Sequence, residues 1–484
     1  MTYMGRFWSH CAGAVATFLT LVMMLGDWLR MTQGSSERWN EFRDNVLRCC
    51  LSRNLQLLAV CLCVGYHLLF LCFKSQRAEG HNECTRSMVA RLDTRDIVRL
   101  FFVLLVASRF IFGWHNITNG KWNDLILGID QTENATILLA GIILGQIMEL
   151  ALSRGFKNPV RAEILVGFLG VLVISNFVHL PLQSSFRYHH LTRSTGIWIN
   201  PNTFGILMGS GLVLLLGLWP QEHYPRRGIA LRAGRWFRPT RFAIVALLLF
   251  GLLHSFSRGA WVGALVGSVY LIVGRCKSAE PSTHFPLLSL GGIKGFLGRR
   301  KLALAVTSVS GLVFLALSSC DIEQPIISRL HSVATASDFS WRNRVEAYRG
   351  ALVMVADHPS FGVGWDSVLE NFDQYYATAN LLDPLSMILN DYFTISVSAG
   401  IPALLLFLVF IVLSFRPADS SRLPLQRTSF IPWDAALIVL LVGGWFDGVL
   451  FHLALAAPFW LFLELVHSNF RGNMNAARAS SVSR

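Results

Sequence analysis

The sequence predicts an all-α protein, a polytopic bundle of about twelve transmembrane helices, from its composition and from the lengths of its apolar runs. Hydrophobic residues make up 53% of the 484 positions and charged residues only 15%, too few to cover an ordinary soluble surface. The apolar residues form runs of roughly 20, the length that a helix needs to cross a bilayer. We expect spans at residues 11–29, 54–73, 97–117, 132–152, 162–180, 204–219, 242–256, 259–274, 302–319, 388–415, 434–449 and 451–466.

The basic residues predict the orientation of this bundle. Arg226, Arg227 and the run 299–301 fall in segments on the same side as both termini, which the positive-inside rule assigns to the cytoplasm. The segment 320–387 then lies on the outer side, away from nucleotide-activated donors. Chemistry there must use a substrate that is already activated and delivered by lipid. The net charge of +13 accordingly points to anionic lipid as a partner, and not to nucleic acid.

The same pattern divides the chain into five parts. We expect N-terminal transmembrane helices in 1–160, central ones in 161–319, a large periplasmic loop with amphipathic helices in 320–387, C-terminal helices in 388–468, and a disordered cytoplasmic tail in 469–484. No P-loop, H-E-x-x-H motif or clustered Cys/His set occurs, so the sequence predicts no metal site and no cofactor.

An amphipathic helix is predicted inside the outer loop, between Ser340 and Ala356. Its apolar residues recur at helical spacing, and arginines lie on another face. Such a helix at the boundary of membrane and water can hold an anionic headgroup. A surface helix that only packs the loop down is the alternative. The basic residues that we assign to substrate binding here are Arg342, Arg344 and Arg349.

Two further groups of residues are expected on the same outer face. One runs from Arg187 through Arg193 to Gly196 and continues at Asn200-Pro-Asn, where the Asn-Pro pair starts a new helix and leaves an anion site beside Arg193. The other is Ser257-Arg258-Gly259-Ala260-Trp261, a tight reversal between two spans. Arg258 there is either an interfacial anchor or a phosphate ligand. Guanidinium groups from all three segments could together bind a diphosphate.

Two charged residues fall in or near apolar runs, Arg109 in the middle of one and Glu149 near the end of the next. A charge in lipid is costly, so it indicates either a functional site or an ion pair between neighbouring helices.

In this order, the motifs resemble the O-antigen ligase and polymerase superfamily. The resemblance covers roughly residues 160–415, and its more specific parts are the S-R-G-A-W reversal and the turn Asp357-His358-Pro359…Gly362-Val363-Gly364, followed by Asn390-Asp391-Tyr392 and Gly400-Ile401-Pro402. It implies a GT-C-like glycosyltransferase of the bacterial inner membrane. Such an enzyme moves a glycan from undecaprenyl diphosphate to lipid A-core or to another glycan on the periplasmic side, without a metal or nucleotide. It also implies that Arg193 and Arg258 bind the donor diphosphate. We assign Arg187, Asn390 and His358 to substrate binding as well.

The chain departs from the family pattern at Leu389, where members usually carry a histidine that activates the acceptor. Leucine can neither take a proton nor donate a hydrogen bond. Asp391 is the nearest replacement as a general base, with a capping role as the alternative. Other groups that folding could bring close are Asp357, His358, Asp366, His189 and His190.

Several functions remain open at this point. The chain is an O-antigen ligase-like transferase, a polymerase of the same superfamily, a relative that only binds lipid-linked glycan, or a transporter of such lipids. Against a transporter, we find no internal repeat of broken helices. The identities of the glycan and acceptor, and the oligomeric state, are not specified by the sequence.

Overall fold

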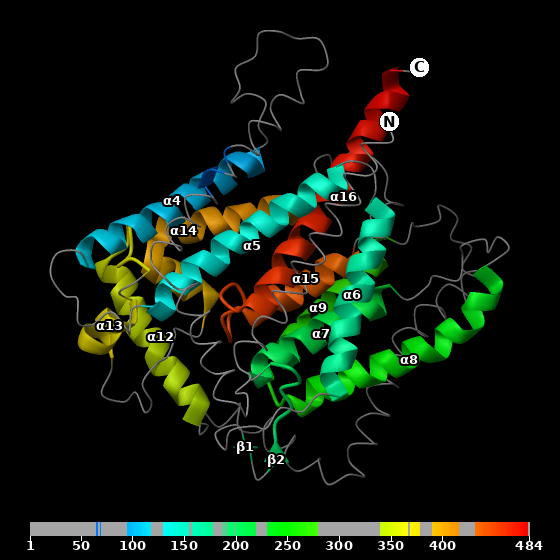
Figure 1. Ribbon diagram of the computed structural model, residues 1–484, viewed down its shortest axis with the longest axis horizontal. Coiled ribbons are helices and arrows are strands. Elements are labelled where there is room, and N and C mark those ends of the chain that lie inside the picture. Colours follow the sequence, from blue (N-terminus) through cyan, green and yellow to red (C-terminus); the bar gives the residue numbers. More distant parts are fainter. Residues whose placement is uncertain are drawn as a thin grey trace, which may run out of the picture.

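A computed structural model describes the structure of the protein at residues 64–65, 68, 94–117, 129–153, 157–177, 187–188, 191–198, 200–218, 230–278, 339–365, 368–377, 390–415 and 431–482. The predicted spans 11–29 and 302–319, and nearly all of 54–73, lie outside these residues. The remaining predicted runs are helices (Figure 1). The described elements are α4 (Thr94–Ile117), α5 (Ile129–Ser153), α6 (Lys157–Phe177), β1 (Arg187–Tyr188), β2 (Leu191–Thr192), α7 (Pro201–Gly217), α8 (Ala230–His254), α9 (Arg258–Ser278), α12 (Phe339–Asp357), α13 (Val368–Asn371), η4 (Phe372–Tyr376), α14 (Asp391–Phe415), α15 (Ile431–Gly443) and α16 (Leu453–Val482).

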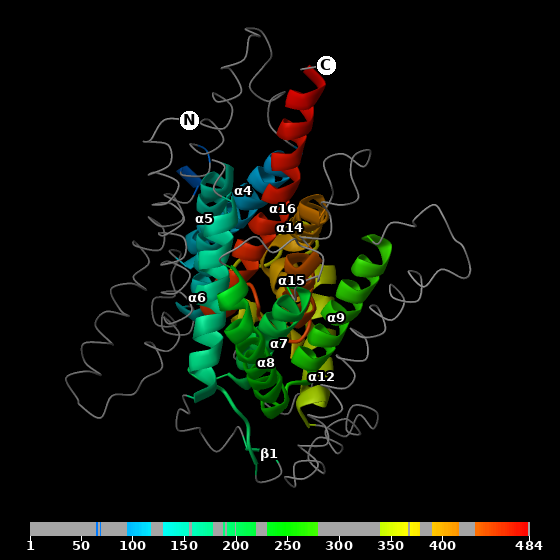
Figure 2. The ribbon, with the colours of Figure 1, turned by 90° about the vertical axis from the view of Figure 1, so that its right-hand side faces the viewer.

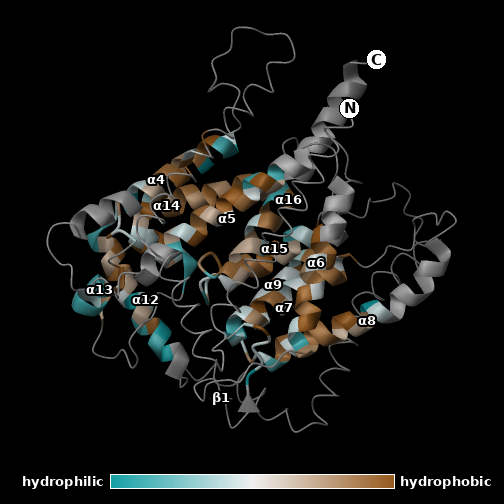
Figure 3. Cartoon of the chain, viewed as in Figure 1, coloured by the Kyte–Doolittle hydropathy of each residue, from teal (hydrophilic) through white to brown (hydrophobic). Residues whose placement is uncertain are grey.

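The described part is therefore helical apart from the short antiparallel pair β1–β2, in which Arg187 lies opposite Thr192. Within it, α14 is the one helix long and apolar enough by itself to cross a membrane, while seven other helices contain shorter apolar stretches. Apolar residues dominate α14, α9 and α7, whereas α12 and α13 carry more polar ones (Figure 3). The structure thus agrees with an all-α bundle, and twelve spans remain a prediction.

Helix α7 lies in the centre of the bundle, and nearly all of its residues are buried. It packs against α8, α9 and α15. Glycines allow these helices to approach closely: a Cβ added at Gly209 would lie 3.2 Å from the Cβ of Ala264, and one at Gly263 would lie 3.0 Å from the backbone oxygen of Val439. Small residues at such contacts are how helices associate in lipid, where burial of apolar surface offers little driving force.

Helix α14 is kinked at Gly400, which has φ 86°. Pro402 cannot donate to the carbonyl of Ser398, so Gly364 donates to it instead, at 3.0 Å. Val363 donates to Val397 at 2.8 Å in the same way, and the displaced N–H of Ile401 donates to Pro359 at 2.8 Å. The two motifs, His-Pro-x-x-Gly-x-Gly and Gly-Ile-Pro, are therefore one structural unit.

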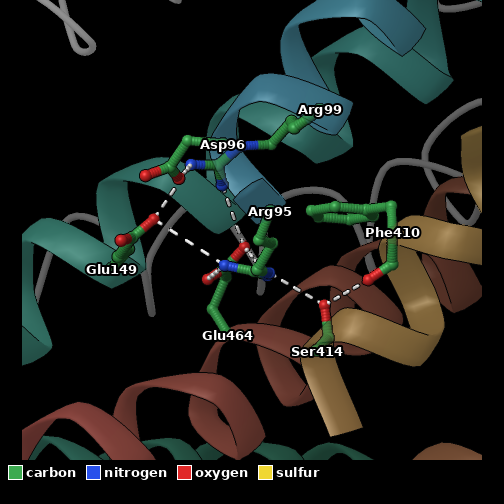
Figure 4. Close-up of polar contacts among 7 residues, drawn as sticks. All are labelled: Arg95, Asp96, Arg99, Glu149, Phe410, Ser414 and Glu464. Carbon is green, nitrogen blue, oxygen red and sulfur yellow. Dashed lines mark hydrogen bonds and ion pairs between the residues drawn. The ribbon is translucent and has the colours of Figure 1, made fainter. Parts of the chain in front are cut away.

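A buried charge cluster joins four helices at the other end of α14 (Figure 4). Arg95 of α4 donates to both carboxylate oxygens of Glu464 in α16, at 2.9 and 2.7 Å, and to Ser414 of α14 at 2.8 Å. Arg99 contacts Glu464, Asp96 and Glu149 of α5, at 3.0 to 3.1 Å. Glu149 is thus paired between neighbouring helices, one of the two interpretations that the sequence allowed. Arg109, in contrast, donates to the carbonyl of Gly362 at 3.3 Å.

Three boundaries differ by more than five residues from the predictions. Helix α8 begins at Ala230, well before the predicted start at residue 242. The run 434–449 ends as a helix at Gly443, because residues 444–452 form turns. The tail, which we expected to be disordered from residue 469, continues as helix α16 to Val482. Alanines at 476, 477 and 479 favour helix, and no proline follows residue 458 to end it.

Candidate functional site

The connection between α15 and α16, Gly444-Trp-Phe-Asp-Gly-Val-Leu-Phe-His452, is where the motifs of the sequence meet. We call it the 444–452 connection. It lies at the end of the bundle where α14 and α16 begin, and the charge cluster lies where α14 ends. At 1.5 Å per residue, the helical stretch from Asp391 to Ser414 separates the two by roughly 35 Å. Figure 2 shows the long helices running between these ends, with β1 at one end and the C-terminus at the other.

Asp447 is the polar centre of this connection, and its side chain is fully buried. Its Oδ2 accepts a hydrogen bond from the side chain of Asn200 at 3.1 Å, and its Oδ1 accepts from the N–H of Gly448 at 2.9 Å. Nε2 of His452 lies 3.6 Å from the same Oδ1. One carboxylate therefore joins the start of α7 to the start of α16.

Helix α12, in the segment that we predicted to be an outer loop, is bound to the same connection. Arg344 donates to the carbonyl of Phe446, and the hydroxyl of Tyr348 donates to the carbonyl of Trp445 at 2.8 Å. Of the other arginines predicted to bind substrate, Arg342 is exposed, and Arg349 is 65% exposed and pairs with Glu346 at 2.9 Å. Only Arg344 of these three is shown in contact with the connection.

Arg193 and the S-R-G-A-W reversal lie next to each other. Nε of Arg193 donates to the carbonyl of Ser255 at 2.9 Å, and Nη2 donates to Oδ1 of Asn202 at 3.1 Å. The side chain thus links the reversal to the first turn of α7, which begins at Pro201 with Asn200 as its N-cap. Phe256, directly before the reversal, has φ 49°, a left-handed conformation that is rare and strained for a bulky residue.

Arg258 is the first residue of α9 and is partly buried. Ser257 precedes it, and its Oγ accepts from the N–H of Ala260 at 3.4 Å, which makes it the cap of the helix. A Cβ added at the next residue, Gly259, would lie 2.5 Å from the Cβ of Phe446, so this turn rests directly on the 444–452 connection. The segments carrying the two predicted donor ligands therefore meet at one place.

Asn390 and Asp391 begin α14 and face the same connection. Oδ1 of Asn390 accepts from the N–H of Tyr392 at 2.9 Å, which caps the helix, and its Nδ2 donates to Trp445 at 3.3 Å. Oδ1 of Asp391 accepts from the N–H of Leu450 at 3.0 Å. A Cβ at Gly444 would overlap the other oxygen, Oδ2. Both residues thus position the connection.

The remaining candidates are distributed more widely. His358 is exposed, and its carbonyl accepts from Gly362 at 3.0 Å in the turn that fills the kink of α14. Arg187 is in β1. Leu389, Asp366, His189 and His190 lie outside the described residues.

Asp447 and His452 were missed in the sequence because we assigned residues 434–466 to two nearly continuous spans. Their signal was the pair of glycines around Trp445-Phe446-Asp447, since glycine on both sides of a charged residue interrupts an apolar run and marks a turn.

The electrostatics of the connection follow from burial and from its neighbours. Burial alone would raise the pKa of Asp447, but hydrogen bonding and charge from His452, together with the charge of Arg344, hold this pKa below its ordinary value. Burial raises the pKa of Tyr348, so its hydroxyl stays a donor at neutral pH. Among the described residues, no group of three His, Cys, Asp or Glu side chains is arranged to hold a metal ion.

Comparison with known proteins agrees with the motifs. No curated protein matches the chain. A family model described as O-antigen ligase does match, over residues 243–408, which include the S-R-G-A-W reversal, α12, the glycine turn and the kink of α14. Residues 243–408 are therefore similar to the O-antigen ligase superfamily, as the motifs predicted.

Proposed function

We propose that this protein is an O-antigen ligase-like glycosyltransferase. It takes a glycan from an undecaprenyl-diphosphate carrier and transfers it to an acceptor, lipid A-core or another glycan, on the periplasmic face of the bacterial inner membrane. The match to the O-antigen ligase family supports a transferase of the ligase or polymerase type. Polymerisation of the same carrier-linked glycan is the alternative, and it differs only in the acceptor.

The observation that carries this proposal is the meeting of arginine-bearing segments at the 444–452 connection. Arg193 contacts Ser255, just before the reversal that bears Arg258, the reversal rests on Phe446, and Arg344 donates to the carbonyl of Phe446. A diphosphate needs several positive charges as it leaves, and guanidinium groups can bind phosphate oxygens through paired N–H donors.

The proposed reaction follows from this arrangement. The acceptor hydroxyl attacks the anomeric carbon of the donor sugar, and the bond from this carbon to the diphosphate oxygen breaks. The electron pair stays with the diphosphate, where Arg258 and Arg193 stabilise it. A single displacement inverts the anomeric configuration. Because arginines neutralise the leaving group, the scheme requires no metal ion.

The first test replaces Arg258 with alanine in the purified protein, reconstituted in liposomes with carrier-linked glycan and acceptor. Because Arg258 would touch the diphosphate, we expect a loss of transfer of at least roughly 100-fold, as for other groups that stabilise transition-state charge. Arg258→Lys should recover only part, since lysine lacks the planar fork. Arg193→Ala should also lower the melting temperature, because Arg193 holds the reversal as well.

Arg241→Ala is the matched control, because Arg241 lies in the half of α8 away from the reversal and is partly exposed. Transfer by the Arg258→Ala variant at the rate of this control would overturn the donor site. Movement of the intact carrier lipid across the liposome membrane without transfer would identify a transporter instead. Supplying only carrier-linked glycan, or only lipid A-core as acceptor, separates polymerase from ligase.

A further inference from the structure

The 444–452 connection brings a histidine to the site of a chain that has leucine at position 389. His452 is the last residue before α16, and 26% of its side chain is exposed. The two nearby aspartates, Asp391 and Asp447, are 3% and 0% exposed. His452 is thus the titratable side chain of this group that a substrate can reach.

The position of His452 is determined by its backbone and by Asp447. Its N–H donates to Gly448 at 3.1 Å, and its carbonyl accepts from Leu455 and Ala456 at 3.0 and 2.8 Å, in the first turn of α16. Nε2 lies 3.6 Å from Oδ1 of Asp447. The backbone of His452 is therefore fixed at the helix start, and its ring lies beside the carboxylate of Asp447.

Asp447 is itself held in place. Asn200 donates to one oxygen at 3.1 Å and Gly448 to the other at 2.9 Å, and the whole residue is buried. A carboxylate fixed in this way beside an imidazole orients the ring and stabilises the cation that forms when the ring takes a proton.

Asp391 is less suited to take a proton from an acceptor. The N–H of Leu450 occupies its Oδ1, and Gly444 covers its Oδ2 so closely that a Cβ there would overlap it. An acceptor hydroxyl would have to displace the connection to reach either oxygen. A general base must lie within hydrogen-bond reach of the proton that it removes.

We propose that His452 is the general base of the transfer reaction and that Asp447 is its positioning residue. This inference rests on the proposed function. With Nε2 facing Asp447, Nδ1 accepts the proton of the acceptor hydroxyl as the oxygen forms its bond to the anomeric carbon. The bond to the diphosphate breaks, its electron pair leaves with the diphosphate, and the proton stays on His452 until solvent removes it.

Two carboxylates interact with this histidine, Asp447 in its own connection and Asp391 at the start of α14, and the charge of Arg344 on α12 acts on Asp447. A negative charge on Asp447, 3.6 Å from Nε2, stabilises the imidazolium that forms in the reaction. Variants at these positions should therefore shift the pH at which transfer sets in.

The test measures transfer by the purified full-length protein in liposomes, across pH, for wild type, His452→Ala and His452→Gln. We expect kcat to fall by roughly 100-fold or more in both variants, with the KM for carrier-linked glycan unchanged, because the base acts on the acceptor. The rising limb of the pH profile should disappear, and added imidazole should restore part of the rate to His452→Ala. The Asp447→Asn variant should retain the rising limb of the pH profile, but at a different pH.

His467→Gln is the matched control, a buried histidine about four turns further along α16. Melting temperatures show which variants fold. If His452→Gln folds and transfers with the wild-type kcat and pH profile, the inference is overturned while the proposed function stands. If His452→Ala loses activity without rescue by imidazole and His452→Gln retains the pH limb, a structural role replaces it. Absence of transfer by the wild type would overturn both.

Discussion

Two buried aspartates, Asp391 beside the 444–452 connection and Asp447 within it, have different contacts and therefore different roles. Asp391 accepts from a backbone N–H and is covered by Gly444, so it holds the connection against α14. Asp447 accepts from Asn200 and faces His452, so it links α7 to the one partly exposed histidine of this group. Both residues are acidic and buried, and only the geometry separates their roles.

The lowered pKa of Asp447 predicts how stability depends on acid. A carboxyl whose pKa is lower in the folded than in the unfolded protein contributes stability above its unfolded pKa, near 3.9, and loses it as the pH falls through the folded pKa. We therefore expect Asp447→Asn to have a lower melting temperature than wild type at pH 7. Its melting temperature should then fall less steeply between about pH 5 and pH 3. Parallel curves for the two proteins would contradict this assignment.

At the scale of elements, the kink of α14 and the glycine turn after α12 complete each other. The turn supplies the N–H groups of Val363 and Gly364 to carbonyls that the kink leaves open, and Pro359 accepts the N–H of Ile401. A buried backbone group without a hydrogen-bond partner is costly, so each element satisfies groups that the other leaves open. The turn also reaches α4 through Arg109, and Trp365 donates to the carbonyl of Val106 at 3.2 Å.

Gly400→Ala tests this unit. A Cβ at Gly400 would lie 2.5 Å from the carbonyl oxygen of Ser360, and the residue has φ 86°. An alanine there would therefore have a strained backbone, and its Cβ would overlap this oxygen. We expect a loss of more than about 1 kcal/mol in the free energy of unfolding, with release of the glycine turn.

The measurement is thermal unfolding in detergent, with limited proteolysis of the turn. Gly170→Ala in α6 is the matched control, because nothing lies within 4 Å of a Cβ there and alanine is the better helix former. Equal melting temperatures for the two variants would show that the kink does not depend on glycine.

At the scale of the whole molecule, polar groups gather at both ends of the bundle, and the helices between them are apolar (Figure 3). The cluster of Arg95, Arg99, Glu149 and Glu464 connects α4, α5 and α16, and Ser414 adds α14. Its members are almost completely buried and bind one another. The charge cluster therefore has a structural role, because its members bind one another. The groups around the 444–452 connection, in contrast, include a partly exposed histidine.

Removal of one partner from this charge cluster should strongly lower the stability of the protein. Glu464→Ala leaves Arg95 and Arg99 buried beside fewer carboxylates, and we expect a loss of roughly 3 to 5 kcal/mol in stability. Glu346→Ala, which breaks the exposed pair with Arg349, should cost about 0 to 1 kcal/mol. Chemical unfolding of both variants in the same detergent makes the comparison, and similar midpoints would refute the structural role of the cluster.

Much of this protein follows from the chain of amino acids alone. Apolar runs of helical length predicted the presence of α4 to α9 and α14 to α16, though not every boundary, because a helix satisfies its own backbone and needs only a local pattern. The amphipathic pattern predicted α12, and the Asn-Pro pair predicted the start of α7, since both signals act within a few residues. The resemblance of the motifs to the O-antigen ligase family was confirmed by the family match.

Only the tertiary structure decided which of these residues meet. Arg193 reaches Ser255, and Asn200 reaches Asp447, across 62 and 247 positions of sequence, respectively. The sequence drew attention to Asp391 as a base because it lies near Leu389, whereas the fold encloses it and places His452 beside Asp447. A periodic pattern reports which face of a helix is apolar, but contacts between distant segments depend on how whole helices pack, and no local pattern contains that information.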